Sequence, residues 1–174
     1  MALYAVLLEL DNKGIIKLFD YICSEFMITN NIRPYIAIGA FECEREGVIM
    51  DFYSGLSQFL EPVEVTFKSV GLFESGSVYL RPELDEKLKS NYYKTYATMS
   101  KHFDAGFGGK YLPSKWIPHL TVGYDPCPEE AQQMYKLVDK NFRPFKCRLN
   151  TSALARCAPY KVISRAPLVF DGVL

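Results

Sequence analysis

Hydrophobic residues along the chain follow two different periods, which predict strands alternating with helices. Apolar and polar residues alternate strictly over residues 63–68, as is typical of a half-buried strand. In residues 13–26 the apolar side chains instead recur at helical spacing. On these two patterns we expect strands at residues 3–10, 34–41, 63–73, 77–80, 117–124, 145–155 and 162–170, and helices at residues 13–26, 48–60, 82–103 and 128–142.

The order and spacing of these elements predict the α+β class. Short turns between neighbouring strands, such as Glu74-Ser75-Gly76, favour antiparallel pairing although helices alternate with the strands. The 174 residues contain no low-complexity or linker-like stretch and fit one domain. We expect it to consist of two lobes, about residues 1–84 and 85–174, which can exchange strands at their ends.

A short internal repeat supports the two lobes. The sequence Pro34-Tyr35-Ile36-Ala37-Ile38-Gly39 matches Pro118-His119-Leu120-Thr121-Val122-Gly123 at an offset of 84 residues, close to half of the chain. Residues two apart on a strand face the same side, so His119 and Thr121 project together, as do Tyr35 and Ala37. Two lobes related by a pseudo-two-fold axis would turn these faces toward each other across a central cleft.

Composition narrows the function classes only slightly. The net charge is zero, but residues 1–84 hold six Lys and Arg against twelve Asp and Glu, a net −6, which leaves the second half at +6. A basic half can attract a polyanion, although the halves can equally attract each other. The chain shows no secretory signal and no stretch able to span a bilayer, so we expect a cytoplasmic protein that does not bind membranes.

The cysteines and histidines argue against a metal site or a cofactor. Five cysteines form no C-x-x-C pair, and their odd number suits a reducing compartment. We therefore expect five buried, structural thiols. With only His102 and His119 available, a zinc site of ordinary spacing is not expected.

The residues around the second copy of the repeat carry a family resemblance. Tyr111-Leu112-Pro113, Trp116 and the segment from Pro118 to Gly123 resemble the second signature of the two-histidine (2H) phosphoesterases, which include 2′-5′ RNA ligase-like proteins and cyclic nucleotide phosphodiesterases. The resemblance implies a bilobal α+β fold of antiparallel sheets flanked by helices, with a phosphate-binding cleft between two His-x-Thr or His-x-Ser strands. It also implies that His119 is a catalytic acid or base and that Thr121 donates a hydrogen bond to phosphate.

The first copy departs from this motif at both catalytic positions. Tyr35 stands at the position of the first histidine, and Ala37 stands at the substrate-facing position of the hydroxyl residue. With a pKa near 10, a tyrosine is mostly protonated at neutral pH and is a poor general base, although it can still donate a proton. Loss of one acid or base typically lowers a rate by about 100- to 10,000-fold. We therefore expect two-histidine catalysis to be weak or lost.

Other residues are weaker candidates for the site. Trp116 and Tyr124 bracket the motif and are candidates to stack on a base, although aromatic residues at strand ends more often pack structurally. Lys110, Lys115 and Arg165 are candidate phosphate contacts. The glycine-rich loop of residues 104–110 does not match a P-loop but is placed to line the mouth of the cleft. His102 is expected to cap a helix end or to face solvent.

These observations leave three hypotheses for the function. The chain is an enzyme acting on a 2′,3′-cyclic phosphate or a 2′-5′ phosphodiester, a non-catalytic protein that binds a nucleotide or RNA end, or a protein-interaction module on the same fold. In each case we expect a monomer without a cofactor.

Overall fold

The computed structural model describes residues 1–10, 13–26 and 33–169, which form one strongly curved antiparallel sheet flanked by helices. The strands are β1 (Ala2–Leu10), β2 (Tyr35–Cys43), β3 (Val63–Leu72), β4 (Ser77–Pro82), β5 (Asp104–Ala105), β6 (Leu120–Tyr124), β7 (Phe145–Cys157) and β8 (Tyr160–Pro167). The helices are α1 (Lys13–Glu25), α2 (Glu46–Ser57), α3 (Glu86–Met99) and α4 (Pro128–Asn141), with a 3₁₀ turn, η1, at Phe107–Gly109. The expected α+β class with antiparallel strands is confirmed.

The strand order repeats itself when read from either end. The order is β5-β2-β1-β7-β3-β4-β6, with β8 paired to β7. Apart from β5 and β8, the part of the chain before the β3–β4 turn supplies β1, β2 and β3, and the part after that turn supplies β4, β6 and β7. Exchanging β2 with β6, β1 with β4 and β3 with β7 gives the same order read from the opposite end. A pseudo-two-fold axis between β7 and β3 requires this.

The same irregularity occurs in both copies of the repeat. Between β1 and β2 the register passes from Leu7↔Ala37 to Val6↔Gly39, which leaves Ile38 as an extra residue. Between β4 and β6 it passes from Tyr79↔Thr121 to Val78↔Gly123, which leaves Val122 as the extra residue. Ile38 and Val122 occupy equivalent positions of the repeat. Because a β-bulge bends a strand and increases its twist, both motif strands are bent at the same place.

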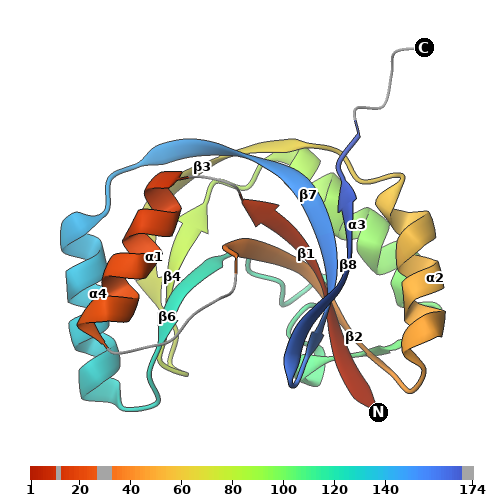
Figure 1. Cartoon of the computed structure of the whole chain (residues 1–174), viewed down its shortest axis with the longest axis horizontal. Helices are drawn as coiled ribbons and strands as arrows, with labels where there is room; N and C mark the ends of the chain where they lie inside the picture. Colours follow the sequence, from red (N-terminus) through yellow and green to blue (C-terminus); the bar gives the residue numbers. More distant parts are fainter. Residues whose placement is uncertain (11–12, 27–32, 170–174) are drawn as a thin grey trace.

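Helices cover the two ends of the sheet (Figure 1). Helix α1 precedes β2 in the chain but packs against β6, and α3 precedes β6 but packs against β2. The parts of the chain before and after the β3–β4 turn therefore exchange helices as well as their last strands β3 and β7. The lobe boundary at about residue 84 stays a prediction, because elements of both halves are interleaved in one sheet.

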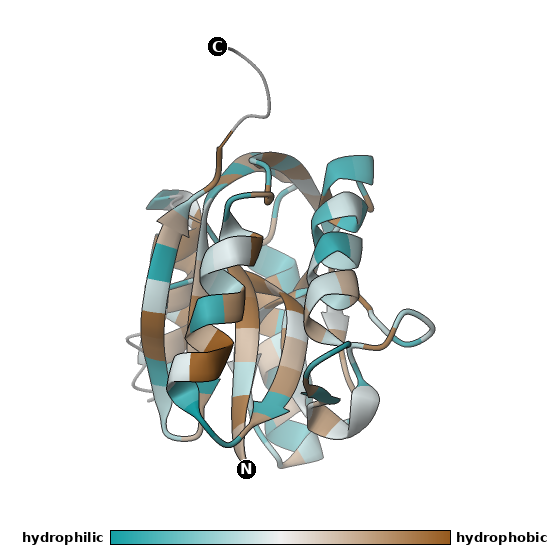
Figure 2. Cartoon of the chain, turned by 90° about the vertical axis from the view of Figure 1, so that its right-hand side faces the viewer, coloured by the Kyte–Doolittle hydropathy of each residue, from teal (hydrophilic) through white to brown (hydrophobic). Residues whose placement is uncertain are grey.

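Most of the core lies between the sheet and these helices. Figure 2, which turns the right-hand side of Figure 1 toward the viewer, shows brown, hydrophobic bands along the strands and mixed teal and brown helices. The motif glycines leave room for close helix packing, since a Cβ at Gly39 would lie 3.0 Å from a methyl group of Thr95 in α3. A Cβ at Gly123 would lie 2.2 Å from the sulfur of Met134 in α4.

One expected helix start is wrong. The proline at position 82 ends β4, paired with Phe67, and α3 begins only at Glu86. Proline lacks the N–H that continues a ladder, so it also suits a strand end. The start of the helix is set by Asp85, whose carboxylate accepts hydrogen bonds from the backbone N–H groups of Lys87 and Leu88.

The expected last strand extends to residue 170, which lies outside the described residues. In the structure β8 ends at Pro167.

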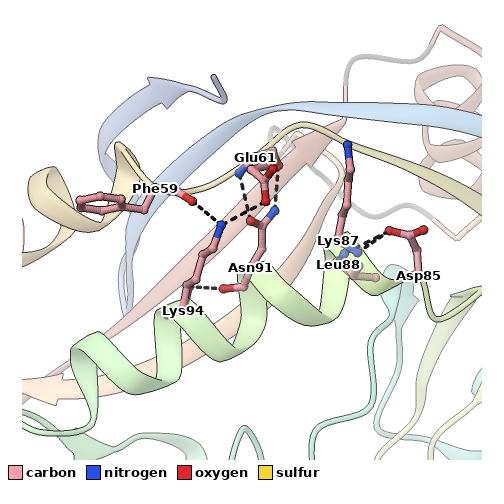
Figure 3. A network of polar contacts seen from close by, with 8 residues as sticks. Phe59, Glu61, Asp85, Lys87, Leu88, Asn91 and Lys94 are labelled. Atoms are coloured by element: carbon pink, nitrogen blue, oxygen red, sulfur yellow. Dashed lines mark hydrogen bonds and ion pairs between the residues drawn. The ribbon is translucent and has the colours of Figure 1, made fainter. Parts of the chain in front are cut away.

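A buried amide fixes α3 to the chain segment between α2 and β3 (Figure 3). Asn91 is fully buried. Its side chain accepts a hydrogen bond from the backbone N–H of Glu61 at 3.0 Å and donates one to the carbonyl oxygen of the same residue at 2.8 Å. Lys94 adds bonds to the carbonyl of Phe59 and to the Glu61 carboxylate. Since α3 packs on β2, this network also holds the helix behind the first motif strand.

We predict that Asn91→Ala lowers the free energy of unfolding by about 1–3 kcal/mol, because two backbone groups of Glu61 lose their partner. Lys94→Ala is the matched control on the same helix, and its partly exposed ion pair should contribute less than about 1 kcal/mol. Urea denaturation of both variants measures the difference. Equal effects of the two substitutions would contradict the assignment of Asn91 as the main anchor.

Candidate functional site

The two motif strands approach each other on the concave side of the sheet. Strands β2 and β6 lie close together although they are far apart in the strand order. The indole Nε1–H of Trp116 donates a hydrogen bond of 3.1 Å to the carbonyl oxygen of Ala37, which connects the segment before β6 to β2. Curvature of the sheet thus brings the two copies of the repeat into one region.

His119 directly precedes β6 and is held by its backbone and by two aromatic rings. Its Nδ1 lies 2.7 Å from the carbonyl oxygen of Ile117. Because a carbonyl only accepts, this nitrogen carries the proton, and in the neutral ring Nε2 is left with a free lone pair. The rings of Phe73 and Tyr79 meet the imidazole edge to face, with centroids 5.0 Å and 5.7 Å away.

The surroundings of His119 favour its neutral form. Burial lowers the pKa of the imidazole below its ordinary value, although the hydrogen bond to Ile117 acts in the opposite direction. At neutral pH the ring is therefore a proton acceptor at Nε2. This is the state that a general base requires.

Tyr79 of β4 lies beneath the imidazole of His119. It pairs with Thr121 across the β4–β6 ladder, which places the half-buried Thr121 on the same side of the sheet as His119. The phenol ring lies flat over β3, where a Cβ at Gly71 would come within 2.3 Å of it. Arg81 donates a hydrogen bond to the Tyr79 hydroxyl at 3.0 Å. Tyr79 is therefore held between the two neighbouring strands, β3 and β6.

A cleft of about 680 Å³ opens beside His119. Its lining combines two lysines and one glutamate with a serine, a histidine, four aromatic side chains and one isoleucine: Phe73, Glu74, Ser75, Phe107, Lys110, Tyr111, Lys115, Trp116, Ile117 and His119. The volume is typical of a site for a small ligand. The cationic and apolar groups together suit a ligand with an anionic part and a flat apolar part.

The other copy of the motif has a different chemical character. Ala37 is buried in a small apolar cluster, and Tyr35 packs against its edge. The buried members of this cluster are Ala5, Leu7, Ala37, Ala153 and Ala155. Burial raises the pKa of the Tyr35 phenol, so it stays protonated at neutral pH. Tyr35 and Ala37 do not line the cleft beside His119 within the part of the chain that the structure describes.

The structure places some of the remaining sequence candidates in the cleft and others outside it. Lys110 and Lys115 line the cleft, as does Phe107 of the glycine-rich loop. Trp116 also lines it, but one face of its indole is stacked on Tyr92, with ring centroids 4.0 Å apart. Tyr124 is exposed at the far end of β6 and is not among the lining residues in the described part of the chain.

Arg165 and the cysteines correct the sequence expectations. The Arg165 guanidinium is already paired, since it donates hydrogen bonds of 2.9–3.2 Å to the buried Glu9 carboxylate. Not all of the thiols are buried, because Cys127 is exposed and Cys23 and Cys157 are half-buried. His102 is exposed and packs against Phe52 with the two rings tilted, their centroids 4.3 Å apart.

Sequence reasoning missed Phe73 and Tyr79 at the histidine. Both residues lie in the β3–β4 hairpin, and they reach His119 only through the pairing of β4 with β6. A strand pattern in the sequence does not provide this register. The hairpin turn that carries Phe73 is fixed by Gly76, whose φ of 92° favours glycine and where a Cβ would lie 1.8 Å from the carbonyl oxygen of Asp125. The turn between β3 and β4 is thereby held against the end of β6, at the mouth of the cleft.

The described residues contain no group of three or more His, Cys, Asp or Glu side chains placed to hold a metal ion. Among the same residues, no helix has the length and apolar character needed to cross a membrane.

Comparisons with known structures agree with this architecture. The chain superposes on TT0787 of Thermus thermophilus with a TM-score of 0.63 and 15% identity, covering 97% of this chain and 98% of that one. For E. coli LigT in complex with NADP⁺ the TM-score is 0.62 at 10% identity, again covering 97% and 98%. A third structure, described as a phosphoesterase, gives 0.63 at 11% identity, with coverage of 98% and 100%. At these identities the likeness shows the fold alone.

The family is shown by the sequence. No curated protein sequence matches the chain significantly. The model of the 2′-5′ RNA ligase superfamily matches residues 34–158, which include both motif strands and most of the chain. The chain therefore belongs to the 2′-5′ RNA ligase superfamily, among the two-histidine phosphoesterases that its sequence resembles.

Proposed function

We propose that this protein binds the phosphate of a nucleotide or an RNA end beside His119 and Thr121, with weak or lost cyclic phosphodiesterase and RNA ligase activity. It acts as a cytoplasmic monomer, a location supported by five unpaired cysteines. The observation that carries the proposal is the asymmetry of the two motif strands. One presents a histidine to a cleft containing two lysines, whereas the other presents a buried alanine and a half-buried tyrosine.

The second motif strand supports phosphate binding. Lys110 and Lys115 supply positive charge at the cleft, and His119 becomes a further cation when a bound anion stabilises its protonated form. The Thr121 hydroxyl is two residues further along the same face, where it can donate to a non-bridging oxygen. Structures of E. coli LigT have been solved with 3′-AMP, with ATP and with phosphate, which supports a nucleotide phosphate as the ligand class.

The first motif strand supports weak or lost turnover. Cleavage of a phosphodiester requires a base at the attacking oxygen and an acid at the leaving oxygen. His119 can take one of these roles. The raised pKa of Tyr35 makes it a poor base and a reluctant acid, and Ala37 has no group to donate to phosphate. One proton transfer is therefore left to water.

We predict that His119→Ala and Thr121→Ala each weaken binding of 3′-AMP by about 1.5–3 kcal/mol, the contribution of a charge-assisted hydrogen bond. Calorimetric titration measures the affinities. His102→Ala is the matched control, because this second histidine is exposed and lies away from the cleft. Equal affinities for the wild type and both site variants would exclude the site, and absence of any binding would favour a protein-interaction module.

A second prediction concerns protonation of His119. Its burial predicts a pKa below about 6.5 in the free protein. A bound phosphate should raise this pKa, so affinity should increase as the pH falls toward the pKa of the bound imidazole. NMR titration of the two imidazoles, assigned with His119→Ala, measures both values. An unchanged pKa on saturation with 3′-AMP would show that the phosphate does not lie at His119.

A third prediction concerns turnover. The wild type should hydrolyse 2′,3′-cyclic AMP slowly or not at all, whereas Tyr35→His with Ala37→Thr should raise the rate by about 100-fold or more. Tyr35→His alone should supply most of the gain, because the hydroxyl at position 37 mainly orients phosphate. Addition of His119→Ala to the double variant should abolish it. Rapid turnover by the wild type that is lost in Tyr35→His would show instead that Tyr35 is a functional acid.

A further inference from the structure

The segment of residues 106–116 forms a strap across β2, anchored at both ends. At its start, the backbone N–H of Gly106 donates to the carbonyl oxygen of Ala40 at 2.9 Å. At its end, Trp116 donates to Ala37 and stacks on Tyr92. Between the anchors the chain turns tightly, with hydrogen bonds from Leu112 N–H to Gly109 and from Trp116 N–H to Leu112. The strap is therefore held in one place relative to the motif strand beneath it.

The strap directs the side chain of Tyr111 onto the first motif strand. Its ring packs against the apolar cluster that contains Ala37 and borders Tyr35. The hydroxyl of Tyr92 donates a hydrogen bond of 2.7 Å to the Tyr111 carbonyl, which fixes the backbone from which the ring projects. Tyr111 also lines the cleft that contains His119. One side chain thus contacts both the site of the intact motif and the cluster that replaces the degenerate one.

The small side chain at position 37 complements this arrangement. Ala37 is 6% exposed, and the other buried members of its cluster are three alanines and Leu7. Small residues on a sheet leave a shallow depression, which the rings of Tyr35, Tyr111 and Tyr160 cover. Burial raises the pKa of the Tyr111 phenol, with Tyr35 and Cys157 as further causes, in agreement with a ring enclosed in this depression.

The geometry of a phosphate group explains why Tyr111 matters for the choice of ligand. The four oxygens around phosphorus are arranged tetrahedrally, so when one ester oxygen lies at His119 the other three point away from it into the cleft, which Tyr111 also lines. In a monoester these three oxygens are terminal. In a diester between two nucleosides one of them carries a second sugar, which must share the cleft with the ring of Tyr111.

We infer that Tyr111 is a specificity-determining residue that restricts the cleft to ligands with one nucleoside on the phosphate. The ligand class is a nucleoside monophosphate or the terminal phosphate of an RNA, and 2′-5′-linked diesters are excluded. This inference rests on the proposed phosphate site at His119 and adds to it the side chain that occupies the room of a second ester group.

The test compares three probes on the full chain by calorimetric titration. They are 3′-AMP, the diester adenylyl-(2′→5′)-adenosine, and a trinucleotide with a 3′-terminal phosphate, which separates an RNA end from a free nucleotide. The wild type should bind 3′-AMP at least tenfold more tightly than the diester. Tyr111→Ala should bring the two affinities within about threefold of each other. Tyr111→Phe should keep the preference, because the ring and not the hydroxyl occupies the space.

Tyr111→Val is a second small variant that keeps an apolar cover over Ala37 and guards against loss of folding in the alanine variant. A diester that binds the wild type as tightly as 3′-AMP would overturn the inference. So would an unchanged preference in whichever small variant is folded by circular dichroism. If neither mononucleotide nor trinucleotide binds the wild type, the proposed phosphate site itself fails, which is distinguishable from a site that binds both esters equally.

Discussion

Pairing of the long strand β7 with both β3 and β1 is the constraint on which the cleft depends. Residues 145–149 of β7 pair with β3, and residues 149–156 pair with β1. This one strand therefore joins the part of the sheet that carries β6 to the part that carries β2. Because sheets twist and bulges increase the twist, the ends of the joined sheet curve toward each other. Figure 1 shows β7 and β3 arching over the space between the two ends. Without this continuous strand, His119 and Tyr35 would belong to separate sheets.

The backbones of the two motif strands resemble each other more closely than their side chains do. Both motif strands have the same bulge, the same glycine and a helix exchanged from the other half. The side chains on the concave face differ in chemical character. At the β6 end they leave a cleft with a histidine and two lysines, and at the β2 end they form a packed cluster of alanines and tyrosines. Burying tyrosine rings contributes apolar area to stability, and Ala37 has no group to donate to phosphate. Position 37 of the first motif is thus part of the packed interior.

The sequence predicted the elements and the repeat well, because both depend on local patterns. The spacing of apolar residues placed four helices and the main strands, and the match between Pro34–Gly39 and Pro118–Gly123 predicted the symmetry that the strand order confirms. What it could not predict depends on contacts between distant residues. Pairing of Tyr79 with Thr121, stacking of Trp116 on Tyr92 and the bond of Arg165 to Glu9 each need the register of two strands or the path of a loop. Tyr111 belonged to the motif resemblance, yet its packing against the cluster that contains Ala37 follows only from the strap.

The hydrogen bond from His119 to Ile117 determines what a site with one histidine can do. It fixes the proton on Nδ1 and leaves the lone pair on Nε2, and burial keeps the ring neutral. Such a ring is ready to accept a proton but not to donate one. A phosphate ligand changes this, because its charge stabilises the imidazolium and turns the base into a hydrogen-bond donor. For a reaction the site would still need a second group of opposite role, and the protonated, half-buried Tyr35 does not supply it readily. Under the proposed function, the neutral histidine that would begin catalysis in a two-histidine site therefore serves here to recognise an anion and not to transform it.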